Sequence, residues 1–381
     1  MGNNIPQGYK ATALGIIPQE WKTIRLKDCF SISAGGDVQK DCFSEAPSLQ
    51  YKYPIYSNSL FNHGLYGFTS HPRHKANSIT ITGRGALGHA EYREIDFDAI
   101  VRLLVLAPKI PLNGQYITEY INFRKPFFYE STGVPQLTAP QIANIQVLFP
   151  PLGEQRKIAE VLGVWDEAIE KQARLIEKLA LRKRGLMQRL LSAKLRLPGF
   201  SEPWKIHKLQ ELFTERNETN RTDLPLLSIT GDRGVILQTE SEKRDTSNDD
   251  KSKYKRIAKG DIGYNTMRMW QGRSALSGLE GIVSPAYTIV VPNTDVDGYY
   301  MSVLFKQPRL IYDFWTHSQG LVGDTLNCKY RDFGQVHICC PPLAEQKAIT
   351  EVLTAADREI ELAKEKLERL RRQKRGLMQQ L

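Results

Sequence analysis

A segment of 41 residues occurs twice in this chain of 381 residues, and the second copy follows the first at a constant offset of 191. Residues 150–190 read PPLGEQRKIAEVLGVWDEAIEKQARLIEKLALRKRGLMQRL, and residues 341–381 read PPLAEQKAITEVLTAADREIELAKEKLERLRRQKRGLMQQL. The copies align without a gap and are identical at 21 positions, including PPL.EQ and KRGLMQ. Charged helices resemble one another in composition but do not share such motifs, so the segment is an internal repeat.

Apolar residues in each copy recur at alternating spacings of four and three, which is the heptad pattern of a coiled coil. The Pro-Pro pair before each copy excludes helix at that point. We expect two long helices that pair, antiparallel if the molecule has internal two-fold symmetry; the alternative is that each helix packs on its own neighbouring domain. Lys183 and Lys374 lie in the same stripe, where their charge needs an acid or solvent. The residues expected to pair are Ile158, Leu162, Ile169, Ile176, Leu179, Leu186, Ile349, Leu353, Ile360, Leu367, Leu370 and Leu377.

The two segments that precede the helices are also related to each other. One opens with WKTIRLKDCF at 21–30 and the other with WKIHKLQELF at 204–213, and both fit W-K-x-x-[RK]-L-x-[DE]-x-F. In both, short β-type stretches, a helical stretch and a last strand before Pro-Pro follow in the same order. Runs of β-branched and aromatic residues bounded by Gly and Pro indicate sheets. The expected fold class is α/β (α+β), with two similar mixed domains separated by the two helices and a pseudo-two-fold arrangement.

These boundaries divide the chain into domain 1 (1–149), helical region 1 (150–197), domain 2 (198–340) and helical region 2 (341–381). The formal net charge is +10, of which these segments carry +3, +5, 0 and +2 by their Lys, Arg, Asp and Glu counts. A basic chain suggests a nucleic-acid partner. Because the two domains are nearly neutral, tight DNA binding would need a partner that neutralises phosphates.

Several functional classes find no support in the sequence. There is no GxxxxGK[ST] phosphate loop and no [DN]PP[YF] motif of an amino-methyltransferase. The seven histidines are scattered, and HPRH at 71–74 has no cysteine nearby to complete a metal site, so no metal is expected. No apolar run could span a bilayer, the first residues do not form a secretory signal, and five cysteines without a CxxC pair indicate free thiols in a reducing cytoplasm.

The alternation of domain, helix, domain and helix resembles the specificity (S) subunit of type I restriction–modification systems. The resemblance covers essentially the whole chain and rests on PPL.EQ and KRGLMQ in both repeats. The segment YNTMRMWQG (264–272) followed by GIVSPAY (281–287) is similar to a common class of recognition domains in that family.

This resemblance implies a non-catalytic subunit of a methyltransferase and endonuclease complex. Each recognition domain would bind one half of a split double-stranded DNA site, and the paired helices would set the gap and dock two methyltransferase subunits. Restriction subunits would join the full complex. No cofactor is expected on this chain, whereas the partners would use S-adenosylmethionine, ATP and magnesium.

Arg on guanine and Asn or Gln on adenine are the usual base contacts, which makes NTMRMWQGR at 265–273 the strongest candidate. The alternative is that Met267, Met269 and Trp270 are core and only Arg268 or Gln271 is exposed. The corresponding stretch of domain 1 is TGRGALGH at 82–89, where glycines allow backbone to approach a phosphate. Residues 251–256 (KSKYKR) are expected to contact phosphate or to be merely solvated. The candidate DNA-binding residues are Arg84, His89, Gln136, Asn265, Arg268, Gln271, Arg273 and Ser318.

Two other functional classes remain open at this point. A solitary sequence-specific DNA-binding regulator would need no methyltransferase, but the neutral second domain argues against strong unaided binding. A structural coiled-coil adaptor would need no DNA, but Arg, Asn and Gln in the divergent domain loops argue against it. Co-purification with a methyltransferase subunit would separate the three classes.

Overall fold

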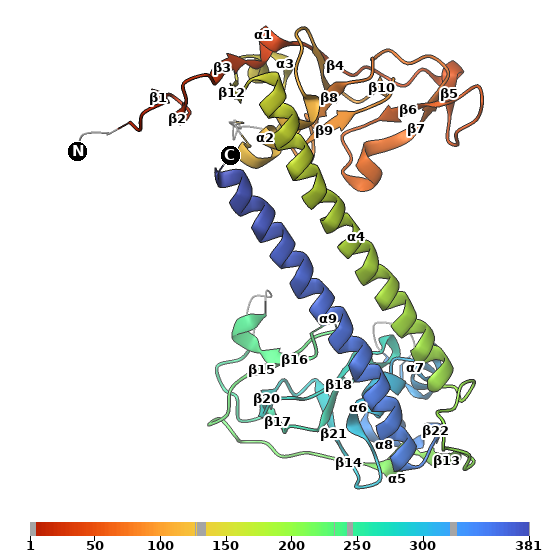
Figure 1. Ribbon diagram of the computed structural model, residues 1–381. Helices are drawn as coiled ribbons and strands as arrows, with labels where there is room; N and C mark the ends of the chain where they lie inside the picture. Colours follow the sequence, from red (N-terminus) through yellow and green to blue (C-terminus); the bar gives the residue numbers. More distant parts are fainter. Residues whose placement is uncertain are drawn as a thin grey trace. The chain divides into compact units, whose positions relative to one another are not determined.

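The computed structural model describes residues 5–125, 127, 135–231, 233–241, 247–320 and 326–380 (Figure 1). The chain divides into two compact units. Unit 1 comprises Met1–Ala173 and Glu365–Leu381, and unit 2 comprises Arg174–Lys364. The long helices α4 (Leu152–Leu190) and α9 (Leu343–Gln380) each contribute residues to both units. Among the described residues, no helix is long and apolar enough to cross a membrane.

Unit 1 contains two four-stranded sheets. The first has the order β4-β11-β8-β9 and is antiparallel throughout. The second has the order β10-β6-β7-β5, and β3 pairs separately with β12 as β1 does with β2. The strands are β1 (Tyr9–Thr12), β2 (Gly15–Pro18), β3 (Lys22–Arg25), β4 (Phe30–Ala34), β5 (Phe43–Ser44), β6 (Tyr53–Tyr56), β7 (Leu65–Thr69), β8 (Ser78–Ile81), β9 (Ala90–Arg93), β10 (Asp98–Ala99), β11 (Leu104–Pro108) and β12 (Gln146–Phe149). The short helices are α1 (Leu26–Cys29), α2 (Gly114–Arg124) and α3 (Ala139–Ala143), with 3-10 turns η1 (Lys40–Cys42) and η2 (Phe61–Gly64).

Unit 2 repeats the first sheet of unit 1. Its order is β14-β21-β18-β19, again antiparallel, and β13 pairs with β22 as β3 does with β12. The strands are β13 (Lys205–Lys208), β14 (Phe213–Glu215), β15 (Leu227–Ile229), β16 (Val235–Leu237), β17 (Lys255–Ile257), β18 (Ile262–Asn265), β19 (Ser274–Leu276), β20 (Gly281–Val283), β21 (Tyr287–Pro292) and β22 (His337–Cys340). The helices are α5 (Leu209–Leu212), α6 (Gly298–Leu304), α7 (Pro308–His317) and α8 (Tyr330–Gln335), with η3 (Gln238–Glu240) and η4 (Met269–Gln271). The expected pair of similar mixed α/β domains is confirmed.

The helices α4 and α9 run antiparallel within each unit, as expected. In unit 1, Leu377 and Met378 of α9 pack on the same core as Ile158 and Leu162 of α4. In unit 2, Leu186 of α4 packs on the core that holds Ile349 and Leu353 of α9. Each domain core therefore includes the start of one helix and the end of the other.

Only the middle of the expected stripe forms a helix–helix cluster of its own. This cluster contains Ile176, Leu179, Ile360 and Ala363. The remaining stripe residues are buried or half-buried; near the helix ends they pack on the sheet domains as well as on the other helix. Both packing modes considered from the sequence thus occur together, and the contribution of each stripe residue to pairing stays a prediction. Ile169, Leu367 and Leu370 lie in the same stripe, buried or half-buried.

The Glu-Gln pair of PPL.EQ joins each helix to its own domain. The Trp21 indole donates to Glu154 at 2.9 Å, and the Trp204 indole donates to Glu345 at 3.2 Å. Gln155 accepts from the backbone N–H of Asn113 at 2.9 Å and donates to Pro150 O at 2.8 Å. Gln346 makes the matching bonds to Asp297 N (2.9 Å) and Pro341 O (2.9 Å). These bonds satisfy buried polar groups where the helix begins, and they explain why the repeat contains this motif.

The lysine of each KRGLMQ copy is paired with an acid from the other copy. Lys374 Nζ lies 2.6 Å from Asp166 Oδ1 and 2.6 Å from Glu119 Oε2. Lys183 pairs with Asp357, the counterpart of Asp166 at the same offset of 191, and the Tyr299 hydroxyl donates to that carboxylate at 2.5 Å. The sequence required an acid or solvent at these lysines, and the structure provides acids.

Candidate nucleic-acid interface

The loop that follows β18 combines an apolar anchor with exposed polar side chains. Met269 is fully buried, and Trp270 is half-buried with its indole N–H donated to Met267 O at 3.0 Å. Arg268, Gln271 and Arg273 are exposed. Met267 is also 48% exposed, so only one of the three apolar residues that could have been core is fully buried.

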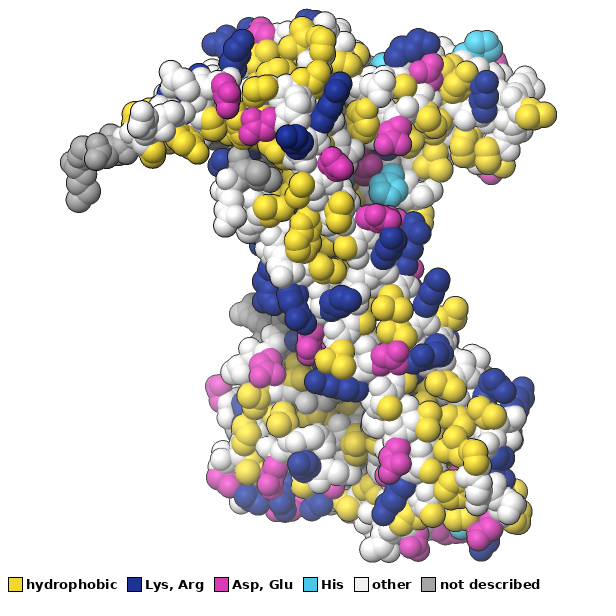
Figure 2. Space-filling model, viewed as in Figure 1, with side chains coloured by type: hydrophobic (Ala, Val, Ile, Leu, Met, Phe, Trp, Pro, Cys, Tyr) yellow, Lys and Arg dark blue, Asp and Glu magenta, His cyan; other side chains and the backbone are white. Residues whose placement is uncertain are grey.

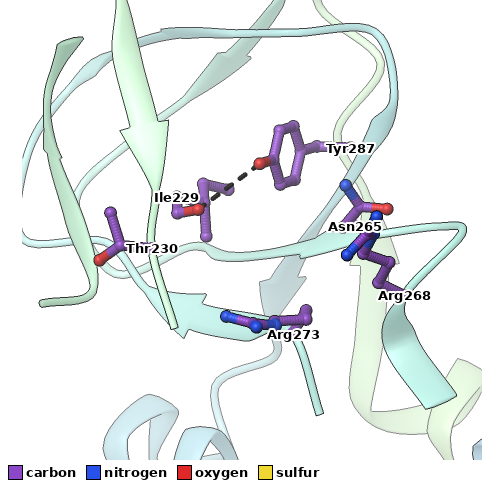
Figure 3. Close-up of a pocket in the computed structure, with 6 residues that line it drawn as sticks. All are labelled: Ile229, Thr230, Asn265, Arg268, Arg273 and Tyr287. Atoms are coloured by element: carbon purple, nitrogen blue, oxygen red, sulfur yellow. Dashed lines mark hydrogen bonds between the residues drawn. The ribbon is translucent and has the colours of Figure 1, made fainter. Parts of the chain in front are cut away.

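Three of the predicted residues meet at one pocket of about 230 Å³ in unit 2. Its lining consists of Ile229, Thr230, Asn265, Arg268, Arg273 and Tyr287. Figure 3 shows Asn265 and Arg268 close together, with Ile229 and Thr230 on the other side of the pocket. The Tyr287 hydroxyl donates to Ile229 O at 3.5 Å.

Arg273 enters this pocket because the neighbouring backbone position is a glycine. A Cβ added at Gly231 would lie only 2.3 Å from Arg273 Nη1. Within the part of the chain that the structure describes, neither Arg268 nor Arg273 has a carboxylate in ion-pair range. Two guanidinia and an amide are therefore available to an external acceptor, the chemistry expected for base or phosphate contact.

The loop after β8 in unit 1 brings two other predicted residues together. Arg84 and Gln136, both exposed, line a pocket of about 380 Å³ that also includes Gly83, Arg102 and Thr138. The Asn58 side-chain oxygen accepts from the backbone N–H groups of Gly83 (2.7 Å) and Arg84 (3.3 Å). These two hydrogen bonds hold the loop in place without using the Arg84 guanidinium.

His89 lies apart from this pocket and is already bound by an acid. Its Nε2 lies 3.1 Å from Glu91 Oε1, and His63 Nδ1 lies 3.2 Å from the same carboxylate. Burial raises the pKa of Glu91, but the hydrogen bond from His89 and the charge of Arg93 outweigh burial and leave that pKa below its usual value. His89 is therefore a poorer candidate than Arg84 for binding DNA.

The remaining predicted residues lie outside both pockets. Gln271 is exposed on η4 but does not line the unit 2 pocket. Ser318 donates its hydroxyl to Phe314 O at 2.7 Å, and that bond occupies its donor. The sequence motifs that contain Gln136 and Ser318 also include residues 131–134 and 321–325, respectively. These two ranges lie outside the described residues.

The two histidines of HPRH contact neighbouring side chains. The His74 ring stacks on Phe97 with 5.3 Å between the centroids, and His71 Nδ1 lies 2.8 Å from Ser70 Oγ. Among the described residues there is no group of three or more His, Cys, Asp or Glu that could hold a metal. All five cysteines are free thiols; Cys29, Cys328 and Cys340 are buried, Cys42 is half-buried and Cys339 is exposed.

Comparisons with known proteins match this architecture. A family model described as a type I restriction modification DNA specificity domain matches residues 18–180. A proposed type I specificity subunit of Mycoplasma pneumoniae is 33% identical over 145 residues, which cover 38% of this chain and 39% of that protein. A proposed specificity subunit of the type I restriction enzyme MjaX of Methanocaldococcus jannaschii is 24% identical over 418 residues, covering 98% of this chain and 95% of that protein. By these matches the chain is similar to the type I restriction–modification specificity subunits.

A solved structure agrees on the fold of this chain. The crystal structure of the type I restriction–modification S subunit from M. genitalium superposes with a TM-score of 0.60 at 14% identity, covering 99% of this chain and 96% of that one. The match to the Mycoplasma pneumoniae relative is confined to less than half of that relative's length.

Backbone hydrogen bonds identify equivalent pockets in the two domains of the chain. The Leu137 N–H donates to Gly83 O at 2.9 Å, and the Cys328 N–H donates to Thr266 O at 2.8 Å. Leu137 and Cys328 are again 191 positions apart, so Gln136 corresponds to Asn327. The equivalent unit 2 pocket has about 460 Å³ and is lined by Glu215, Lys255, Thr266, Pro285, Thr288, Asn327, Lys329, Tyr330 and Arg331.

Sequence reasoning missed several residues of these pockets. Arg102, Asn327, Lys329 and Arg331 line them but were not selected from the sequence. Arg102 follows a valine in a β-type run, and no local motif distinguishes it from a strand residue. Asn327 and Lys329 could have been found by applying the offset of 191 to Gln136 and Thr138.

Proposed function

We propose that the two domains of this chain each recognise one half of a split DNA site. The observation that carries the proposal is that two sheets of the same topology have equivalent pockets with different side chains. Unit 1 offers Arg84, Arg102 and Gln136, whereas unit 2 offers Asn327, Lys329 and Arg331 at the equivalent place. Different donors and acceptors on one frame would select different bases.

We propose different roles for the four segments 1–149, 150–197, 198–340 and 341–381. The first and third would contact DNA, and the second and fourth would set the gap between half-sites. Support for a spacer comes from helix length, because the 39 residues of α4 extend for roughly 58 Å at about 1.5 Å per residue. Figure 2 shows basic and acidic side chains interspersed on the visible surface of each unit, which supports a partner that supplies part of the phosphate neutralisation.

The experiment that tests this proposal is a genome-wide map of methylated adenines in strains with and without this gene. We expect a set of methylated sites that depends on the gene and consists of two short sequences separated by a constant gap. The spacer role predicts that constancy, because helices of fixed length fix the distance. A gap that varied among the sites would contradict the spacer role, and the absence of any gene-dependent methylation would contradict the proposed function.

The partners proposed are two methyltransferase subunits, joined by restriction subunits in the full complex. Adenine methylation would use S-adenosylmethionine on the methyltransferase, and cleavage would use ATP and magnesium on the restriction subunit. We place the chain in the cytoplasm, where these partners and DNA are found. The long helices support docking because they expose apolar side chains that the domain cores leave uncovered, at Val161, Val164, Leu175, Leu181 and Leu362.

Charge placed on this exposed helical surface should weaken the complex. We expect Val161→Asp combined with Val164→Asp, two exposed positions of α4 in unit 1, to reduce co-purification with the methyltransferase subunit at least tenfold, because a carboxylate would be desolvated in the interface. Leu49→Asp is the matched control, since Leu49 is fully exposed and belongs to the loop between β5 and β6. Deleting the second repeat would be less informative, because Ile349 and Leu353 belong to the core of unit 2. Unchanged co-purification would exclude this surface as the docking site.

Arg268 provides a test of recognition in unit 2. We expect Arg268→Ala to reduce discrimination at one or two base pairs of one half-site, by about 1–3 kcal/mol if the arginine makes a bidentate base contact. The measurement is competition binding of the reconstituted methyltransferase complex against single-base variants of both half-sites. Arg309→Ala, at an exposed arginine of α7, serves as the control. An even loss across sequences with a smaller salt dependence would show a phosphate contact instead.

A further inference from the structure

The turn between β10 and β11 has a backbone conformation that its residues disfavour. Val101 and Arg102 both have positive φ, at 54° and 59°. Two consecutive non-glycine residues in the left-handed region are uncommon, and a β-branched valine there is an outlier. Both side chains are exposed, so packing in a core does not account for the choice of residues.

The surrounding structure holds this turn in place. The N–H groups of Val101 and Arg102 donate to Gly36 O and Gly35 O at 2.9 Å each, and Leu103 N donates to Ile100 O at 3.1 Å. Gly35 permits this approach, because a Cβ there would lie 2.6 Å from the backbone of Ala99. Strained conformations of this kind persist where neighbours over-determine them, and they concentrate at functional sites.

One side chain connects the turn to the loop already identified as a recognition candidate. Asn58 Nδ2 donates to Val101 O at 2.6 Å, while Asn58 Oδ1 accepts from Gly83 N and Arg84 N. Arg84 and Arg102 therefore project from two backbone segments that are fixed to the same amide. Both line the unit 1 pocket with Gln136, and within the described part of the chain neither guanidinium has a carboxylate partner.

The equivalent turn of unit 2 makes a useful comparison. There Tyr287 N donates to Ser284 O at 3.1 Å, the same bond that Leu103 makes to Ile100. The two intervening residues are Pro285 and Ala286, and neither has positive φ. Ala286 O accepts from Thr266 N at 3.1 Å and from Thr266 Oγ1 at 2.9 Å, so this turn is also fixed to the neighbouring loop. The two turns are held by similar hydrogen bonds. Of the two, only the unit 1 turn carries a cationic side chain and has positive φ values at residues other than glycine.

We propose that Arg102 is a base-recognising residue of the unit 1 domain, and that the left-handed turn at Val101 and Arg102 aims its guanidinium at the base edge beside Arg84. This inference rests on the proposed function and names one residue of unit 1 that would determine which base is recognised. Guanine is the base that arginine binds best, through two acceptors in the major groove. A turn whose φ values are already fixed loses little conformational freedom when DNA binds, which favours discrimination between bases.

The test uses the full chain reconstituted with its methyltransferase subunits and DNA carrying the mapped site. We expect Arg102→Ala to reduce discrimination at one or two base pairs of a single half-site by about five- to 150-fold, with the other half-site unaffected. Arg25→Ala is the matched control, because Arg25 is exposed in the same unit but lies outside the pocket. Loss of discrimination in both half-sites, or an even loss with a smaller salt dependence, would overturn the proposal.

A second variant distinguishes the effect of the turn on the direction of the Arg102 side chain from its effect on stability. Val101→Gly removes the unfavourable valine conformation, so we expect an unchanged or higher melting temperature together with several-fold weaker discrimination at the base pairs that Arg102→Ala affects. A structural turn would show no change in discrimination, and that result would overturn the role of the strained turn. If the wild-type complex methylates a split site but both variants discriminate as it does, the inference fails and the proposed function stands. If the wild-type complex methylates no specific site, the proposed function itself fails.

Discussion

Replacing Lys374 with alanine is expected to destabilise unit 1 by about 3 kcal/mol, the lower end of the range for breaking a buried ion pair. The lysine side chain is only 14% exposed and Glu119 only 12% exposed. Removing the ammonium leaves Glu119 buried without its cation, while Asp166, at 41% exposure, can recover water. The penalty therefore arises mainly from Glu119.

The pH dependence of this variant has a defined sign. Burial already raises the pKa of Glu119 in the intact protein, and the hydrogen bond and charge of Lys374 oppose that rise. Without Lys374 the pKa of Glu119 in the folded state rises further above its unfolded value of about 4.3. A raised carboxyl pKa favours folding at low pH, and this contribution is lost as the pH rises through the folded pKa. The loss of stability should therefore be smaller at pH 5 than at pH 7.5.

Hydrogen exchange followed by mass spectrometry gives the measurement, because peptides from 152–173 and 365–380 report the opening of the helical pair in unit 1. Lys171→Ala is the control in the same unit, since its pair with Glu167 is more than half exposed on both sides and should contribute no more than about 0.5 kcal/mol. Glu119→Gln added to Lys374→Ala should restore most of the lost protection. Equal protection in Lys374→Ala and wild type would show that the pair does not stabilise the helices.

The sequence predicted the features that depend on periodicity and repetition. The apolar stripe of 150–190 located α4 to within two residues of its start, and the offset of 191 related the two lysines before any contact was known. The need for an acid at Lys183 and Lys374 followed from burial of a charge. The identity of the acid did not follow, because Asp166 and Asp357 reach the lysines only through antiparallel pairing.

The recognition pockets were predicted less completely. Asn265, Arg268 and Arg273 are close in sequence, so a single loop brings them together and the sequence was sufficient to find them. Arg84 and Arg102 are 18 residues apart and come together because β8 pairs with β11, while Asn58 bonds to both loops. His89 was selected for its position in the loop, but Glu91 lies two residues away on the adjoining strand and binds it. The strand pairing and long-range hydrogen bonds that bring Arg84 and Arg102 together leave no periodic signal in a single sequence.

Exchanging residues 198–340 for the equivalent domain of a relative with a known target is expected to replace one half of the recognised site and leave the other unchanged. Three base pairs at about 1–3 kcal/mol each imply at least a hundredfold loss of binding to the original half-site. The exchange requires that the contacts between domain 2 and α9 are kept. The incoming domain must supply a tryptophan where Trp204 meets Glu345 and a backbone N–H where Asp297 meets Gln346.

Glu345 also pairs with Arg196 at 2.6 Å, and Arg196 lies in the retained helical region. A matched control is therefore a chimera whose incoming domain has phenylalanine in place of the tryptophan equivalent to Trp204. This control should lose stability and activity on both half-sites together, because Glu345 is almost fully buried and would lack one of its donors. The intact chimera should instead methylate a hybrid site at a rate near that of the parents. Altered recognition of both half-sites by the intact chimera would show that the domains are not independent, since the side chains of unit 1 are the same in both proteins.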